Sequence, residues 1–213
     1  MASLTRITSG IKGRLAWPQR WPSWARLVSD ILSPPLVWAA VGLAVGLKYS
    51  LTPQRGLLWA WIFGLFICLI PILYVGAMVH LGRISDIHMQ HRRERYKPML
   101  VTIGSAVIAL LLLKGLGAPL VFPLLALIAL VQVSLMLIIT LFWQISMHMM
   151  SITAATVALS AMFAPMIGMI AVPFVVLVGA ARLHLKRHTP MQVLAGTLMG
   201  GLVPIGVLYM LNL

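Results

Sequence analysis

Long apolar runs separated by short polar stretches make up the chain from residue 31 onward, and most runs approach the ~20 residues of a membrane-spanning helix. Backbone N–H and C=O groups inside hydrocarbon must be paired within the protein, which a helix does by itself. The pattern therefore predicts an all-α, polytopic bundle of six or seven transmembrane helices. The predicted segments are residues 31–47, 57–80, 99–113, 119–142, 146–163, 165–181 and 190–211.

Proline, glycine and small residues refine these segments. Pro71 lies inside the second segment and predicts a kink, because proline lacks the N–H that an interior helical position donates. Residues 114–119 are too few to form a domain outside the bilayer, so the third and fourth segments are expected to form a tight hairpin. Small side chains allow transmembrane helices to pack closely. They occur in the fifth segment and in the seventh, at Ala154, Ala155, Ala158, Ala161 and the pair Gly196-x-x-x-Gly200.

The composition excludes an ordinary soluble domain. Hydrophobic residues make up 61% of the 213 residues and charged residues only 9%, against about 25% charged in soluble domains. The net charge of +13 would suggest nucleic acid for a soluble protein, but here anionic lipid headgroups are the expected partner and nucleic acid is not. Cys68 is the single cysteine, so neither a disulfide nor a cysteine metal site is expected within one chain.

A basic segment rich in tryptophan, residues 1–29, precedes the predicted helical domain, residues 30–213. It lacks the apolar run that follows the charges of a signal peptide. Tryptophan and arginine interleaved with Pro18 and Pro22 suit the headgroup layer, so we interpret this segment as an interfacial anchor. A disordered tail is the alternative for the first dozen residues.

Seven crossings would place four stretches on one membrane face: the N-terminus and residues 81–98, 143–148 and 182–189. All but three of the 16 Lys and Arg residues then lie on that face, the exceptions being Lys48, Arg55 and Lys114. The positive-inside rule makes this face cytoplasmic, with a cytoplasmic N-terminus in a bacterial inner membrane. The six histidines and three acids also lie on or near it. Because that rule does not explain histidine, the asymmetry predicts a polar site on this face.

The first candidate stretch is residues 83–98, R-I-S-D-I-H-M-Q-H-R-R-E-R-Y-K-P. Helical spacing would bring His88, Arg92 and Arg95 to one face. Guanidinium groups on such a face suit the several oxygens of a phosphate. The alternative is a solvated helix beside the membrane that touches anionic lipid.

The second candidate stretch is residues 143–149, W-Q-I-S-M-H-M, with His148 at the mouth of the fifth segment. Ser146 is a candidate N-cap, and the unpaired backbone amides of a helix start favour an anion. The alternative is a lone interfacial histidine that bonds to a neighbour.

The third candidate stretch joins the last two segments, and in it Arg182 is separated from His188 by five residues. Thr189 and Pro190 begin the final helix directly afterwards. Basic neighbours and the helix N-terminus disfavour a protonated imidazole, so His188 is expected to be neutral and able to act as a nucleophile. The alternative is a basic loop that flanks the membrane.

The three stretches resemble the signatures of the type 2 phosphatidic acid phosphatase superfamily, in the same order and over roughly residues 83–200. Residues 181–192 are similar to the third signature, Ser-Arg-x5-His-x3-Asp. Residues 145–148 are similar to the second, Pro-Ser-Gly-His, and residues 90–98 to the first, Lys-x6-Arg-Pro.

The resemblance implies metal-free chemistry with no cofactor. In that family the third-signature histidine attacks phosphorus and the second-signature histidine protonates the leaving oxygen, roles that would fall to His188 and His148. Arg182 and Lys97, the latter standing where the family has arginine, would hold the phosphate. Arg95 is a further candidate phosphate ligand.

The main departure is Gln192, which stands where the family has the aspartate that orients the nucleophilic histidine; Ala181 likewise replaces the signature serine. In a serine protease, the loss of that kind of carboxylate costs about 10⁴-fold in rate. An active protein is therefore expected to use Asp86 or, as second choice, Glu94 as the orienting acid. The alternative is that Glu94 pairs with the arginines of its own helix, an exposed contact that contributes at most about 1 kcal/mol.

Two functions follow from these residues. One is a lipid-phosphate phosphatase that hydrolyses a phosphomonoester or pyrophosphate through a phosphohistidine, which the joint presence of Arg182, His148 and His188 favours. The other is a catalytically lapsed relative that binds lipid or serves as a structural subunit of a membrane complex, which Gln192 favours. A homo-oligomer or larger assembly is open in both cases. A transporter is less favoured, because no inverted repeat is visible.

Overall fold

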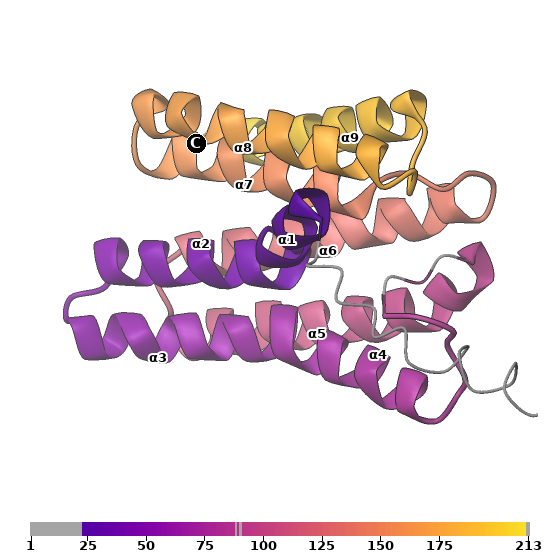
Figure 1. The fold of residues 1–213 in the computed structure, drawn as a ribbon. Helices are drawn as coiled ribbons and strands as arrows, with labels where there is room; N and C mark the ends of the chain where they lie inside the picture. Colours follow the sequence, from indigo (N-terminus) through magenta and orange to yellow (C-terminus); the bar gives the residue numbers. More distant parts are fainter. Residues whose placement is uncertain (1–22, 88, 90, 212–213) are drawn as a thin grey trace, which may run out of the picture.

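The computed structural model describes residues 23–87, 89 and 91–211, and helices dominate them. In chain order the elements are α1 (Trp24–Ile31), α2 (Pro34–Tyr49), α3 (Pro53–Gly64), the π-helical turn η1 (Leu65–Leu69), α4 (Ile70–His80), the 3-10 turn η2 (Arg92–Arg95), α5 (Tyr96–Gly115), α6 (Val121–Thr140), α7 (Met147–Met162), α8 (Pro165–His184) and α9 (Pro190–Met210). Figure 1 shows α2 to α9 running along one common direction, with α1 lying across them. The predicted all-α bundle is confirmed, and each of the seven apolar segments is helical.

Five helical segments in the described part of the chain are long and apolar enough to cross a bilayer. They are Pro53–His80, Arg92–Gly115, Val121–Thr140, Pro165–His184 and Pro190–Met210. A sixth span results if α1 and α2, which bend by 47° at their junction, are counted as one. The remaining apolar segment is α7, whose 16 residues fall short of the usual spanning length. The upper count of six agrees with the lower of the two predicted values.

The irregularity predicted at Pro71 takes the form of the π-turn η1, which directly precedes it. In a π-turn the N–H of residue 71 would bond to the carbonyl of Phe66, five residues earlier, and proline has no such N–H. Ser105 of α5 donates its hydroxyl to the Phe66 carbonyl instead. A neighbouring helix thus satisfies the freed backbone group inside the membrane-spanning region, as the bilayer requires.

The third and fourth segments form the predicted hairpin. α5 packs along α6, and the short connection between them contains Gly117 at a φ of +73°. Glycine adopts this left-handed conformation without the strain that a Cβ would add.

α7 is surrounded by α2, α8 and α9, and its small residues allow this close packing. Three of the four predicted alanines are buried, whereas Ala161 is exposed. On α9, a Cβ at Gly196 would lie 2.5 Å from the Ser146 carbonyl oxygen, and one at Gly200 would lie 2.4 Å from that of Met150. The helix contact predicted from Gly196-x-x-x-Gly200 is therefore confirmed, with α7 as the partner.

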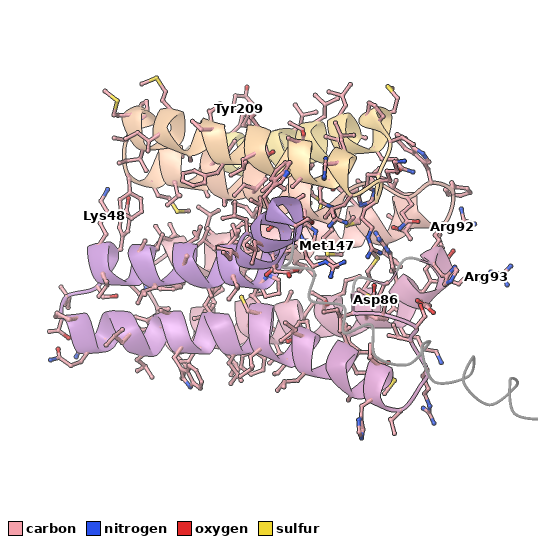
Figure 2. The ribbon with its side chains drawn as sticks, viewed as in Figure 1. Lys48, Asp86, Arg92, Arg93, Met147 and Tyr209 are labelled. Atoms are coloured by element: carbon pink, nitrogen blue, oxygen red, sulfur yellow. The ribbon has the colours of Figure 1, made fainter. Side chains whose placement is uncertain are left out.

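The three candidate stretches lie at one end of the bundle. In Figure 1 the α4–α5, α6–α7 and α8–α9 connections share this end, and the α2–α3 and α7–α8 connections lie at the other. Figure 2 shows Asp86, Arg92 and Arg93 at the first end and Lys48 at the opposite end. The predicted clustering of the polar stretches on one face is thus present in the structure.

The predicted interfacial segment, residues 1–29, lies mostly outside the described residues. Its described part belongs to α1, which continues past residue 29 to Ile31 and packs against α8. The Trp24 ring lies 5.2 Å from that of His184 at the end of α8. α1 therefore belongs to the helical body, and its first residue lies beside the polar end of α8.

Candidate functional site

Three buried polar side chains meet at the polar end: Arg95 from η2, Arg182 from the end of α8 and His188 from the α8–α9 connection. They are only 5%, 3% and 8% exposed, respectively. Both arginines act electrostatically on His188, and Arg182 acts on Arg95. Burying like charges together is unfavourable unless an opposite charge balances them. The cluster is therefore a candidate site for an anion.

Backbone contacts hold the polar connections against one another. The Ser146 N–H donates to the Gln192 carbonyl at 3.1 Å, which ties the start of α7 to the first turn of α9. The Ser146 hydroxyl accepts from the Met149 N–H at 3.4 Å, so Ser146 is the N-cap that the sequence predicted. Arg92 Nη1 donates to the Phe142 carbonyl at 2.7 Å and joins η2 to the α6–α7 connection.

The orientation of Arg95 is fixed by two acceptors. Its Nε donates to the Met89 carbonyl at 2.9 Å. The Gln144 amide lies against the same guanidinium, and its oxygen must face it because guanidinium nitrogens only donate. In that orientation the oxygen accepts from Nη2 at 2.6 Å and from Nε at 3.2 Å. Neither acceptor carries a charge, so these contacts orient Arg95 without neutralising it.

Arg182 is the most deeply buried of the three and has an unused donor. Its Nε finds no hydrogen-bond partner among the described residues. The positive charge of Arg187 and the negative charge of Asp30, the penultimate residue of α1, both act on Arg182. A buried donor without an acceptor costs about 1–3 kcal/mol, and an anion bound here would supply one.

Gln192 fixes the tautomer of His188. The Nδ1 of His188 lies 3.2 Å from Gln192 Oε1, and the Thr189 N–H donates to the same oxygen at 3.0 Å. The Thr189 hydroxyl in turn accepts from the Gln192 N–H at 3.4 Å, which completes a capping box at the start of α9. An amide oxygen only accepts, so Nδ1 carries the hydrogen and Nε2 keeps its lone pair.

The surroundings of His188 keep its ring neutral. Burial is the largest cause that lowers the pKa of His188 from 6.5 to about 4, and the positive charges of Arg182, Arg95 and Arg187 lower it further. The hydrogen bond to Gln192 acts in the opposite direction and raises the pKa. At neutral pH the imidazole is therefore unprotonated at Nε2. This is the protonation state that a histidine nucleophile requires.

His148 lies in the first turn of α7, and it contacts α1. Its Nε2 is 3.1 Å from the Ser29 carbonyl, which can only accept, so this nitrogen donates. Ser29 directly precedes Asp30, and Asp30 acts electrostatically on Arg182. The end of α1 therefore connects His148 with the buried arginine, a link that the sequence did not indicate.

The other predicted site residues lie around this cluster. Asp86 Oδ2 lies 3.7 Å from Arg187 Nη1, one residue before His188. Glu94 accepts from the N–H and the hydroxyl of Ser85, at 3.1 and 2.9 Å. Lys97 is exposed at the start of α5. His88, predicted on one face with Arg92 and Arg95, falls outside the described residues, as does residue 90, which begins the stretch similar to the first signature.

Two site residues were missed by sequence reasoning. They are Asp30, which directly precedes the first predicted segment, and Gln144, which directly precedes the stretch similar to the second signature. The available signal for Asp30 was charge: a chain with three acidic residues has few ways to balance a buried arginine. In the described part of the chain, no group of three or more His, Cys, Asp and Glu side chains could hold a metal ion.

Comparison with known families bears on the same region. Residues 140–213 match the family model of the PAP2 superfamily. The match runs from the end of α6 through α9 and includes His148, Arg182 and His188, whereas Arg95 lies outside it. Over residues 140–213, about a third of the chain, this match supports the resemblance to the type 2 phosphatidic acid phosphatase superfamily. No curated protein and no solved structure gives a significant match to the chain.

Proposed function

We propose that this integral-membrane protein hydrolyses a phosphomonoester or pyrophosphate on a membrane lipid through a phosphohistidine. The observation that carries the proposal is the buried cluster in which His188 is neutral, keeps the lone pair on Nε2, and lies within the electrostatic influence of Arg95 and Arg182. Two guanidiniums suit the charge and the several oxygens of a phosphate. The PAP2-superfamily match over residues 140–213 supports the same reading.

In the proposed first step, the lone pair of His188 Nε2 attacks phosphorus as the bond from phosphorus to the lipid oxygen breaks. His148, in its protonated form, gives a proton to the leaving oxygen, and the lipid product departs. In the second step His148 takes a proton from water while the oxygen of that water attacks phosphorus. The P–N bond breaks, inorganic phosphate leaves and His188 is again neutral.

Arg95 and Arg182 would bind the phosphate oxygens in both steps. Arg182 offers an Nε that has no partner among the described residues, and Arg95 is already oriented by Gln144 and Met89. A bound phosphate would also offset the repulsion between the two guanidiniums. The structure favours Arg95 over the exposed Lys97 for this role, and Asp86 or Glu94 as the orienting acid stays a prediction.

A second candidate function is a catalytically lapsed relative that binds lipid headgroups. The specific observation in its favour is Gln192, which accepts from His188 but brings no negative charge. Phosphorylation of Nε2 leaves a positive ring, because Nδ1 keeps its hydrogen. A neutral acceptor stabilises that ring less than a carboxylate does.

We further propose that the polar end faces the cytoplasm of a bacterial inner membrane, because the topology predicted from the sequence puts all but three of the Lys and Arg residues on that side. Cysteine labelling in intact cells tests this orientation. In a Cys68→Ala background, a cysteine appended after residue 213 should react with an impermeant reagent, whereas Ser85→Cys should not. Labelling of Ser85→Cys but not of the appended cysteine would show that the polar end faces the outside instead.

Phosphate release from a panel of lipid phosphates, by protein purified in detergent, tests the activity. The parent should release phosphate, and His188→Gln should reduce the rate at least about 10³-fold because it removes the nucleophile. The control is His184→Gln, which changes an exposed histidine four residues away on α8. Equal rates in the parent and His188→Gln would refute the mechanism. The second candidate is supported if the parent releases no phosphate yet binds a lipid only when that lipid carries a phosphate group.

A further inference from the structure

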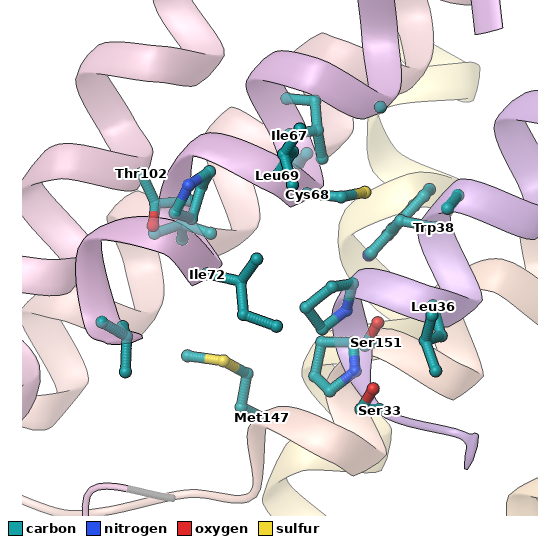
Figure 3. Close-up of a pocket in the computed structure, with 18 of the residues that line it drawn as sticks. Ser33, Leu36, Trp38, Ile67, Cys68, Leu69, Ile72, Thr102, Met147 and Ser151 are labelled. Carbon is teal, nitrogen blue, oxygen red and sulfur yellow. The ribbon is translucent and has the colours of Figure 1, made fainter. Parts of the chain in front are cut away.

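A large apolar cavity lies between α2–α4 on one side and α5–α7 on the other. Its volume is about 880 Å³, within the range of small-molecule sites. Figure 3 shows Trp38, Cys68, Ile72 and Met147 around it. The wall reaches the outer surface at α3, where Trp61 is 62% exposed. Because α3 belongs to a membrane-spanning segment, this part of the cavity wall faces hydrocarbon.

The cavity reaches residues next to the candidate phosphate site, although Arg95, Arg182 and His188 do not line it. Asp30 and His148 both line it. Asp30 acts on Arg182, and His148 is the proposed proton donor to the leaving oxygen. A lipid whose phosphate lies at Arg182 and His188 would therefore direct its chain past His148 into this cavity.

Two buried polar groups on the cavity wall have no partner. Gln132 of α6 is 1% exposed and Ser151 of α7 is 2% exposed. Within the described residues, neither the Nε2 of Gln132 nor the Oγ of Ser151 has a hydrogen-bond partner. A polar group buried among apolar side chains is unfavourable unless an acceptor or donor meets it. Both residues line the cavity, so a molecule bound there can supply the hydrogen-bond partners that these two groups lack.

Two neighbouring hydroxyls are satisfied within their own helix, whereas the Oγ1 of Thr153, two residues after Ser151 on α7, also lacks a partner among the described residues. Thr140 of α6 donates to the Met136 carbonyl at 2.6 Å, and Thr156 of α7 donates to the Ile152 carbonyl at 2.9 Å. Such bonds to the carbonyl four residues earlier are the usual way in which a buried helical hydroxyl is satisfied. Ser151 lacks this bond, although it lies on the same helix as Thr156.

We propose that the cavity binds the acyl chain of an ester-linked lipid phosphate, with an ester carbonyl accepting from Gln132 Nε2 or Ser151 Oγ. His148 and Ser151 are three residues apart on α7, so they share a face and are separated by about 4.5 Å along the helix axis. In a glycerolipid, the ester carbonyl follows the phosphate after a similarly short glycerol backbone. A polyprenyl chain has no acceptor at that depth. The proposal rests on the proposed function and narrows its substrate to acylated lipid phosphates.

Binding of matched lipids to His188→Gln protein in detergent, which cannot form the phosphoenzyme, tests the proposal. The three probes are diacyl phosphatidate, its dialkyl ether analogue, which lacks only the carbonyl oxygens, and diacylglycerol, which lacks only the phosphate. The diacyl phosphatidate should bind about ten-fold more tightly than the dialkyl analogue, as expected for one hydrogen bond to a buried donor.

Substitutions on the cavity wall locate this preference. Gln132→Leu, Ser151→Ala or both should abolish the ten-fold ratio, and the control Thr156→Val should keep it because Thr156 is already bonded within its helix. Without lipid, Gln132→Leu should unfold at a temperature no lower than its parent, since it removes an unpaired buried amide. A purely structural role for Gln132 predicts a lower temperature.

Equal binding of the diacyl and dialkyl lipids would overturn the proposal, as would a ratio kept in the double variant Gln132→Leu, Ser151→Ala. The diacylglycerol arm tests the proposed function separately. If diacylglycerol binds as tightly as diacyl phosphatidate, the phosphate site is refuted, while a persisting acyl preference would still place the chain in the cavity.

Discussion

Replacement of Gln192 by glutamate puts a negative charge where the structure now has a neutral acceptor. Glutamate has the same length as glutamine, so Gln192→Glu can keep both contacts of Oε1, to His188 Nδ1 at 3.2 Å and to the Thr189 N–H at 3.0 Å. Aspartate, the residue of the family signature, is one methylene shorter. The isosteric substitution therefore isolates the effect of charge on His188.

The expected effect on His188 is large. Opposite charges about 4 Å apart interact by about 4 kcal/mol at an effective dielectric constant of about 20. One pKa unit corresponds to 1.36 kcal/mol, so the carboxylate should raise the pKa of His188 from about 4 to about 7. If the protein is catalytic, the same charge stabilises the positive phosphorylated ring and should raise the rate by up to about 10³-fold.

Nitrogen NMR of protein labelled at histidine measures this pKa directly, with the His188 resonance assigned by its loss in His188→Gln. The parent resonance should titrate near pH 4 and that of Gln192→Glu near pH 7. In Gln192→Met, which has similar length but no such acceptor, the pKa should fall below that of the parent. A parent His188 that titrates near 6.5, or a pKa that Gln192→Glu leaves unchanged, would contradict the electrostatic account of the site.

The same pKa makes the stability of the parent depend on pH. An unfolded histidine titrates near 6.5, whereas folded His188 titrates near 4, so between these values the unfolded state binds more protons. Stability is therefore full above about pH 6.5 and falls as the pH drops toward 4, by up to about 3 kcal/mol. Thermal unfolding from pH 7 to pH 4 should show this loss in the parent and less of it in His188→Gln.

Two further predictions concern packing within the membrane, and thermal unfolding in detergent measures both. Gly196→Val should lower the unfolding temperature, because its Cβ would lie 2.5 Å from the Ser146 carbonyl oxygen. The control Gly206→Ala should leave that temperature unchanged, because its Cβ meets nothing within 4 Å. Equal effects of the two substitutions would contradict the α7–α9 contact. Ser105→Ala should destabilise the protein by about 1–3 kcal/mol, because the Phe66 carbonyl loses its donor; an unchanged unfolding temperature would show that this carbonyl needs none.

The apolar pattern predicted the helices because a bilayer imposes a length and a composition on each crossing. Gly196-x-x-x-Gly200 could be read for the same reason, since only small residues let two backbones approach so closely. The details of the second segment were less accessible. Pro71 predicted an irregularity, but its form depends on Ser105, which lies far away in the sequence. Such a contact exists only once the helices are packed.

Some residues of the candidate site could likewise be predicted from the sequence, and others could not. Spacing was sufficient to find Arg182 and His188, because both lie in one short connection at the start of a helix. The spacing of the first signature puts Lys97 at the position where the family has arginine. In the structure, however, Arg95 is the buried residue that joins Arg182 and His188. Asp30 reaches the site through the packing of α1 on α8. No local pattern in the sequence records that packing.

Rapid acid-free quenching of the reaction with a labelled diacyl phosphatidate, followed by mass spectrometry of peptides, tests the central claim most directly. The account predicts a transient phosphoryl group on His188 in the parent and none in His188→Gln, with the exposed His184 unlabelled in both. Release of phosphate by the parent without a phosphoryl group on His188, or with one on another residue, would contradict it.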